Sequence, residues 1–392
     1  MPVTDVSTLP APLRGPAFGS YGADEVSWLL TDLSTVALEA PLEEREEAIQ
    51  AGVAHYAESL PVEYQPTAAY QRLFTRALAD SAERLAHAVG LVTELVLAER
   101  GRRPVLVSLA RAGTPVGILM RRWATFAHGT TLPHYAASIV RGRGIDRVAL
   151  RYLAAAHDPA SVVFVDGWTG KGAITRELTA ALADADAELG LPPGRGFSAD
   201  LAVLADPGSC VRTFGTRADF LIPSACLNST VSGLVSRTVL NDRLIGPGQF
   251  HGAKFYADLR DADVSGEFLD TVAGYFDAVA DRVAADLPIL AGADREPTWA
   301  GWSATERLAA AYGVGDVNLV KPGVGETTRV LLRRVPWKVL VRQDALPFLE
   351  HVLLLADQRG APVEIVDDMP YSCVGIVRPG FRRGAAPSNG PA

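Results

Sequence analysis

Apolar residues in the first hundred positions recur at steps of three and four, which would place them on one face of a helix. The repeat runs through SYGADEVSWLLTDLS and PLEEREEAIQAG, and it is longest in TAAYQRLFTRALADSAERLAHAVGLVTELVLAERG. The pattern predicts that residues 20–100 are largely helical.

Short apolar runs replace this repeat from about residue 104 onward. Val105–Leu109 and Val162–Val165 are each followed by a Gly-containing turn and a helical segment, and DLAVLADPGSCV begins a third unit in the same way. Strands that alternate with helices are typical of a parallel α/β sheet, whose ligands bind at the carboxyl ends of the strands. We therefore expect an α/β core with a parallel sheet.

The helical repeat returns over residues 263–310, with a Pro- and Gly-containing break at LAGADREPTWAGWS. The segments after this break read strand, helix, strand, helix, strand, strand, which predicts a second, small α/β domain. The predicted organisation is a helical N-terminal extension over residues 1–95, a core over 96–262, a helical linker over 263–305, a small domain over 306–380 and a tail over 381–392.

Composition narrows the class of protein. The 392 residues are 48% hydrophobic, enough for a sizeable buried core. No apolar run approaches the roughly 18 residues that cross a bilayer, and the first twenty residues do not resemble a secretory signal. Three cysteines without metal-ligand spacing argue against a disulfide framework or a structural zinc site. We expect a cytoplasmic protein with no membrane partner.

The strongest candidate site is the stretch VVFVDGWTGKGAI, residues 162–174. A predicted strand brings Asp166 to its end, and a glycine-rich turn with Lys171 then opens a helix. Glycines let backbone N–H groups approach an anion, and the helix N-terminus and the lysine supply positive charge. The stretch is neither a Walker A loop nor a dinucleotide fingerprint. It predicts an anion site, and an ordinary strand-to-helix turn is the alternative.

A second loop, SLARAGTPVG, follows the first predicted strand. Arg111 stands there between small residues, and Gly113 permits a close approach of the backbone. Such an arginine could bind a second phosphate group with two hydrogen bonds. A tight structural turn is the alternative.

Together the two loops resemble the pyrophosphate loop and the phosphoribosyl-diphosphate (PRPP) motif of type I phosphoribosyltransferases, over roughly residues 100–182. The resemblance implies a phosphoribosyltransferase-like core. It also implies transfer of a phosphoribosyl group from PRPP or a related phosphosugar, bound with Mg²⁺, to a small or RNA-borne acceptor. Gly167 stands where the family has a second acid, and the turn reads G-K-G-A-I. A protein that only binds nucleotides or phosphosugars is therefore the alternative.

The same resemblance assigns roles to individual residues. Asp166 would orient the ribose, while Arg111 and Lys254 would stabilise the departing pyrophosphate. The contacts to the 5′-phosphate and the pyrophosphate would come from Gly170, Lys171, Gly172, Ala173, Ile174 and Thr175, and from Ala112 and Gly113.

Other polar segments are further candidates for substrate binding. HYAASIVRGRGID carries Arg141 and Arg143 in a predicted mobile basic loop, or in a solvated turn. Glu58, Glu63 and Tyr64 lie around a proline turn that is a candidate hood over the acceptor, or a helix end capped by charges. NSTVSGLVSRT and LIGPGQFHGAKFY are dense in polar groups that suit phosphate or sugar hydroxyls, or local capping: Asn228, Ser229, Thr230, Ser232, His251 and Lys254.

Nearly the whole chain resembles proteins encoded in tellurite-resistance gene neighbourhoods, through FGSYGADEVSWLL, HYAESLPVEY, NSTVSGLVSRTVL and KPGVGETTRVLLRRVPWKVLV. These proteins join a phosphoribosyltransferase-like domain to a C-terminal Pelota-type RNA-binding domain, and the family is also labelled cysteine protease StiP. The resemblance implies RNA contacts in the comparatively basic C-terminal part, from Gly325, Glu326, Thr327 and Arg329. A solvated basic helix face is the alternative. A homodimer is a further expectation.

The protease label can be weighed on the cysteines. A cysteine protease needs a thiolate beside a histidine, together with an oxyanion hole. Cys210 and Cys226 are the candidate nucleophiles and His251 is the candidate partner, but cysteine is commonly a small buried residue. From the sequence we therefore expect a transferase rather than a cysteine hydrolase.

Overall fold

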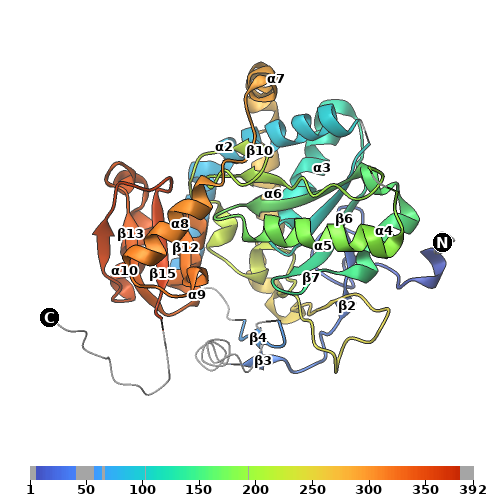
Figure 1. Cartoon of the computed structure of the whole chain (residues 1–392), viewed down its shortest axis with the longest axis horizontal. Helices are drawn as coiled ribbons and strands as arrows, with labels where there is room; N and C mark the ends of the chain where they lie inside the picture. The colour runs from blue at the N-terminus through green and yellow to red at the C-terminus, as the bar shows by residue number, and fades with distance from the viewer. Residues whose placement is uncertain (1–5, 41–56, 64–66, 102, 193, 380–392) are drawn as a thin grey trace.

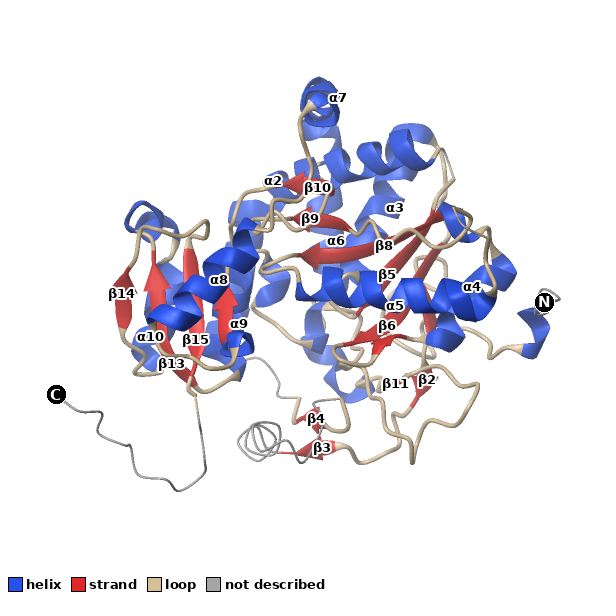
Figure 2. Ribbon diagram, viewed as in Figure 1, coloured by secondary structure: helices blue, strands red, loops and turns tan. Residues whose placement is uncertain are grey.

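The computed structural model describes residues 6–40, 57–63, 67–101, 103–192 and 194–379 of the chain. A larger core unit, residues 6–292, lies beside a smaller C-terminal unit, residues 300–379, which is drawn in orange and red in Figure 1. Each unit is a sheet with helices packed against it (Figure 2). Among the described helices, none is long and apolar enough for a membrane span.

The sheet of the core unit has the strand order β1-β6-β5-β8-β9-β10, with every neighbouring pair parallel and with the short β7 antiparallel to β6. The predicted parallel sheet is confirmed. Ser108 of β5 lies beside Val165 of β8, so the turns after these two strands leave the sheet at the same edge. The strands are β1 Ser27–Leu29, β5 Val105–Ala110, β6 His134–Val140, β7 Gly144–Ile145, β8 Val162–Trp168, β9 Ala202–Ala205 and β10 Thr213–Thr216.

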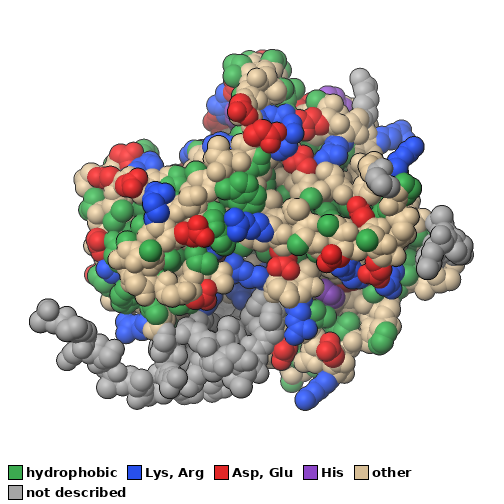
Figure 3. Space-filling model, in the orientation of Figure 1, with side chains coloured by type: hydrophobic (Ala, Val, Ile, Leu, Met, Phe, Trp, Pro, Cys, Tyr) green, Lys and Arg blue, Asp and Glu red, His purple; other side chains and the backbone are tan. Residues whose placement is uncertain are grey.

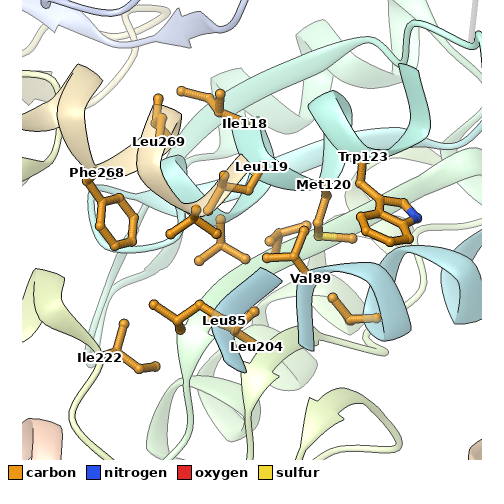
Figure 4. Packing of buried hydrophobic residues seen from close by; sticks show 14 of the residues in the cluster. Leu85, Val89, Ile118, Leu119, Met120, Trp123, Leu204, Ile222, Phe268 and Leu269 are labelled. Atoms are coloured by element: carbon orange, nitrogen blue, oxygen red, sulfur yellow. The ribbon is translucent and has the colours of Figure 1, made fainter. Parts of the chain in front are cut away.

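Helices cover both faces of this sheet because successive strand residues point to opposite sides. Leu106 packs with one layer, whereas Val105 and Val107 pack with the other. The first layer is formed by α2 Ala68–Arg100, α3 Thr114–His128, α6 Ser265–Ala273 and α7 Phe276–Gly292, and the second by α4 Arg147–Ala156 and α5 Ala173–Leu189. Figure 4 shows Leu85 and Trp123 within the first layer.

The helical prediction for residues 20–100 is right for α2 and wrong for residues 27–40. β1 joins the edge of the main sheet, β2 Thr31–Asp32 pairs with β11 Gly252–Ala253, and β3 Glu39–Ala40 pairs with β4 Leu60–Pro61. Trp28 and Leu29 are adjacent and both fully buried, which a strand covered on both faces allows. Over so short an apolar run, helix and buried strand cannot be told apart by periodicity. Residues 41–56, where PLEEREEAIQAG falls, lie outside the described part.

The C-terminal unit has the predicted order of strands and helices. Its sheet runs β12-β15-β13-β14, with β13 and β14 parallel and the other pairs antiparallel. Two apolar clusters surround this sheet. The elements are α8 Ala300–Ala311, β12 Val320–Pro322, α9 Val324–Arg333, β13 Pro336–Val341, α10 Glu350–Gln358, β14 Val363–Ile365 and β15 Cys373–Val377.

The C-terminal unit is fastened to the core at several points. The Arg176 guanidinium of α5 lies over the Trp302 ring, 3.8 Å from its centroid, and 5.0 Å from that of Trp299. The Tyr371 hydroxyl donates to the Gly170 carbonyl at 3.0 Å. The segment that leads into the C-terminal unit, with Trp299 and Trp302, therefore packs against α5 and is not a flexible linker.

Candidate functional site

A cleft of about 1360 Å³ lies between the carboxyl edge of the core sheet and the C-terminal unit. Lys and Arg side chains gather near the middle of the face shown in Figure 3, where the two units meet. Cationic residues line the cleft from both units: Arg141, Arg143, Lys171 and Arg237 from the core, and Lys321, Arg329, Arg333 and Arg334 from the C-terminal unit.

The glycine-rich turn after β8 forms one wall of the cleft. Gly172 has a φ of +73° and precedes the first residue of α5. The Thr175 side chain lines the cleft, and its hydroxyl is buried without a hydrogen-bond partner. Free N–H groups at a helix N-terminus and an unpartnered hydroxyl together suit an anion.

Asp166 lies at the end of β8 and faces the same cleft. Its carboxylate accepts the Gly167 N–H at 2.8 Å. Burial raises the pKa of Asp166 to about 6, and the Gly167 N–H and Arg329 offset part of this increase. A carboxyl group that titrates near neutral pH beside a row of cations is the kind of perturbed group found at functional sites.

Lys171 is engaged by the C-terminal unit. Its ammonium donates to the Val317 carbonyl at 2.5 Å and to the Val320 carbonyl at 3.1 Å. Burial lowers the pKa of Lys171 to about 7, with a further contribution from the nearby Lys321. The lysine that the sequence places in a phosphate cradle therefore joins the two units.

Arg111 is also held within the protein. Its guanidinium donates to the Val235 carbonyl at 2.8 Å and lies 3.5 Å from Glu63 Oε1. Glu63 accepts the Ser229 N–H at 2.7 Å. Burial alone would raise the pKa of Glu63. Arg111 and the hydrogen bonds from Ser229 outweigh this effect, so the pKa lies below its usual value and the carboxylate stays charged. Ala112 lines the cleft, whereas Arg111 is not part of its wall.

Gly113 explains why the loop after β5 is so close to the loop after β8. A Cβ atom at this position would lie 2.4 Å from the Val165 carbonyl oxygen. Only glycine permits this approach, which is to the neighbouring strand, whereas the sequence had suggested an approach to a ligand.

Of the remaining residues predicted to contact substrate, some line the cleft and the others lie away from it. Arg141 and Arg143 line the cleft, on a turn whose Gly142 and Gly144 N–H groups donate to Glu177 at 2.8 and 2.9 Å. Away from the cleft lie the other candidates from the two polar segments: Asn228, Ser229, Thr230, Ser232, His251 and Lys254.

Two of those residues have clear structural partners. The Lys254 ammonium donates to Glu39 and to the Val36 carbonyl, each at 2.7 Å. His251 is bonded to the Ser138 hydroxyl at 2.8 Å. Tyr64, named with Glu63 as part of a hood, lies outside the described residues.

The predicted RNA-contacting turn at the start of α9 is packed against the core. A Cβ atom on Gly325 would lie 2.9 Å from the Trp168 ring, and Thr327 is fully buried. The Arg329 guanidinium lies 4.2 Å from the centroid of that ring and pairs with Glu326 at 3.0 Å. Arg329 and Glu326 line the cleft.

Sequence reasoning missed three residues at this junction. Trp168 and Arg237 line the cleft. The position of Trp168, an aromatic residue next to a glycine-rich turn, is a signal that could have identified it from the sequence. Asp219 is partly buried, and its carboxylate accepts the Val324 N–H at 2.9 Å and the Ser372 N–H at 2.8 Å. Nothing near Asp219 in the sequence indicates these partners, which lie more than a hundred residues away.

The three cysteines are all buried. Burial raises the pKa of Cys210 and of Cys226 to about 12, and it also raises that of Cys373. Cys210 Sγ lies 3.3 Å from the Gly208 carbonyl and 3.8 Å from the Gly170 carbonyl. Within the described residues, no hydrogen bond joins a cysteine to a histidine, and no group of three or more His, Cys, Asp or Glu side chains could hold a metal.

Comparisons with known proteins identify both units. A family model described as tellurite-like stress resistance cysteine protease StiP matches residues 19–273, and a model of the PELOTA RNA binding domain matches residues 299–379. A curated relative, cysteine protease StiP of Acinetobacter baylyi, is 33% identical over 376 residues, which cover 92% of this chain and 94% of the relative. No solved structure matches the chain.

These findings correct the expected activity. The prediction of a phosphoribosyltransferase that uses PRPP is wrong, because the matching family and relative are named as cysteine proteases. The resemblance rested on a strand, a glycine-rich turn and a helix, which many α/β proteins share. We expected Mg²⁺ only because a diphosphate substrate would bind together with it, and that expectation no longer has a basis. The Pelota domain is confirmed. The chain belongs to the StiP family of tellurite-like stress resistance cysteine proteases and carries a Pelota RNA-binding domain in its C-terminal part.

Proposed function

We propose that the cleft binds RNA through its backbone phosphates. The observation that carries the proposal is the origin of the lining cations: Arg141, Arg143 and Arg237 come from the core, and Lys321, Arg329 and Arg334 come from the Pelota-matching unit. Phosphate contacts from Lys and Arg supply most of the affinity of proteins for nucleic acids. The net charge of −8 keeps non-specific attraction elsewhere weak, so the local concentration of cations matters more.

The turn from Gly170 to Thr175 supports the same proposal. Its glycines and the N-terminus of α5 offer N–H donors to a phosphate, and Thr175 offers an unpartnered hydroxyl. Asp166 opposes an anion whenever it is ionised. A pKa of about 6 means that this repulsion weakens as the pH falls below neutrality.

Replacing Arg143 by Ala is the direct test of the proposal. Arg143 is exposed and lines the cleft. Its loss is expected to weaken binding of a labelled RNA by roughly threefold or more, and to reduce the slope of log affinity against log salt by about one. Fluorescence anisotropy between about 50 and 200 mM salt measures both quantities.

The matched control is Arg282→Ala. Arg282 is an exposed arginine of α7 that pairs with Glu83 and lies outside the cleft. We expect its removal to leave RNA affinity unchanged. Equal losses in the two variants, or no RNA binding by the parent protein, would contradict the proposal.

Thiol-dependent peptide hydrolysis is a second candidate function, favoured by the name of the relative and the description of the family. Cys210 is the first cysteine to test, because its Sγ lies against Gly170, a residue of the cleft wall. A nucleophilic thiol must ionise, whereas burial raises the pKa of Cys210 to about 12. Hydrolysis by Cys210 therefore requires a conformation in which this thiol gains solvent or a basic partner.

Single Ala substitutions at Cys210, Cys226 and Cys373 test this candidate. If Cys210 is the nucleophile, Cys210→Ala removes hydrolysis of fluorogenic peptides while RNA binding persists, and the other two variants keep both activities. Full hydrolysis in all three variants, or none in the parent protein, would rule out a thiol peptidase.

A further inference from the structure

The docking of the two units restricts which surface of the C-terminal unit an RNA can reach. At the start of α9, the Val324 N–H already donates a hydrogen bond to the carboxylate of Asp219. Gly325 lies against the Trp168 ring, and Thr327 is buried. A phosphate cannot take the Val324 N–H while Asp219 accepts it, and the Trp168 ring covers Gly325.

Cations from both units line the cleft. Lys321 and Arg329 face it from the C-terminal unit, and Arg141 and Arg143 face it from the core. The cleft volume of about 1360 Å³ exceeds that of small-molecule sites, which is roughly 300–1,000 Å³. It has room for a few nucleotides of one strand. A double helix, with its two backbones held apart by base pairs, cannot place both of them inside it.

Trp168 and Arg329 form a stacked pair in the wall of this cleft. Aromatic rings and guanidinium planes are the groups on which proteins stack the splayed bases of single strands. Paired bases in a duplex are already stacked on one another and cannot use such a pair. The chemistry of the wall therefore favours unpaired bases beside the phosphate-binding cations.

We infer that the cleft selects single-stranded RNA, and that the docked core excludes duplex RNA from the turn at the start of α9. This inference rests on the proposed RNA-binding function. Asp219 acts here as a positioning residue, because it holds the turn against the core without touching RNA. The Trp168–Arg329 pair supplies the preference for unpaired bases.

The test compares a labelled strand of about 12 nucleotides that does not fold on itself with the same strand annealed to its complement. The full chain is expected to bind the single strand at least about tenfold more tightly than the duplex at the same salt concentration. Equal or tighter binding of the duplex overturns the inference. If neither RNA binds, the proposed function fails, and the inference fails with it.

Trp168→Leu tests the stacking pair separately from the phosphate contacts. It is expected to weaken single-strand binding by about tenfold and to leave duplex binding unchanged. Trp302→Leu is the matched control, because Trp302 also carries a stacked arginine, Arg176, but lies outside the cleft. An equal loss for single strand and duplex in Trp168→Leu, or an equal loss in the control, overturns the stacking role.

Asp219→Ala tests the exclusion of duplex. Freeing the turn at the start of α9 is expected to raise duplex affinity severalfold while Arg143→Ala still weakens single-strand binding. If duplex affinity does not rise in a folded Asp219→Ala protein, the core does not exclude duplex. If that variant does not fold, the comparison of single strand with duplex in the parent chain still decides the inference.

Discussion

Asp219→Ala is expected to lower the free energy of unfolding by about 3 kcal/mol at neutral pH. The Asp219 carboxylate is the acceptor for two partly buried N–H groups of the C-terminal unit, those of Val324 and Ser372. Each N–H that is left buried without an acceptor costs roughly 1–3 kcal/mol. Burial raises the pKa of Asp219 to about 6, so removing the charge returns part of this loss. Urea denaturation followed by tryptophan fluorescence measures the difference.

Two further variants delimit this expectation. Asp219→Asn keeps one side-chain oxygen as an acceptor and should lose about half as much stability. Asp344→Ala removes an exposed carboxylate that pairs with Arg342, and exposed pairs contribute little to stability. If Asp219→Ala is as stable as Asp344→Ala, the Asp219 contacts do not hold the units together.

Asp166→Asn is expected to stabilise the protein at neutral pH, by up to about 3 kcal/mol. The folded-state pKa of Asp166 is about 6, above its usual 3.8. Between these values the folded protein retains a proton that the unfolded chain has lost, so stability falls as the pH rises from 3.8 to 6. Above that range the Asp166 carboxylate is ionised in both states, and the free-energy cost of burying its charge no longer changes with pH. Contact with solvent in the cleft makes this cost smaller than the pKa difference alone implies. Asn removes the charge and can still accept the Gly167 N–H.

The pH dependence of Asp166→Asn separates this cause from others. Its advantage over the parent protein should be largest at about pH 7.5 and should disappear towards about pH 4, where both side chains are neutral. RNA affinity at about pH 7.5 should rise as well, because the cleft loses a negative charge. Asp184→Asn, on the exposed side of α5, is the control and should change neither quantity. An advantage that does not vary with pH would contradict the assigned cause.

The sheet was predictable because its strands are short apolar runs that end in turns. Val105–Leu109 and Val162–Val165 are buried on both faces, and the glycine-rich turn after the second run fixes the start of α5. The same reasoning failed at Trp28 and Leu29, where a strand of three residues contains too few positions for a period to be seen. Local pattern was sufficient where the elements were long.

The candidate site was predictable only in part, since its charges are used by residues far away in the chain. Arg111 and Lys171 look available in the sequence, but Val235 engages the first, and Val317 and Val320 engage the second. Conversely, Arg143 of the core and Arg329 of the C-terminal unit line the same cleft, and no spacing in the sequence indicates that they lie in one site. The incorrect transferase assignment arose from interpreting the loops without these partners.

Arg176 contacts both Trp299 and Trp302 and so fixes the path by which the chain enters the C-terminal unit. Two binding surfaces on a flexible linker would meet a ligand one after the other, at an effective concentration set by the linker length. Here the folded protein holds the two surfaces in a fixed relative position before any ligand binds. The entropy of bringing them together is lost during folding, so a ligand that contacts both surfaces does not lose it again on binding.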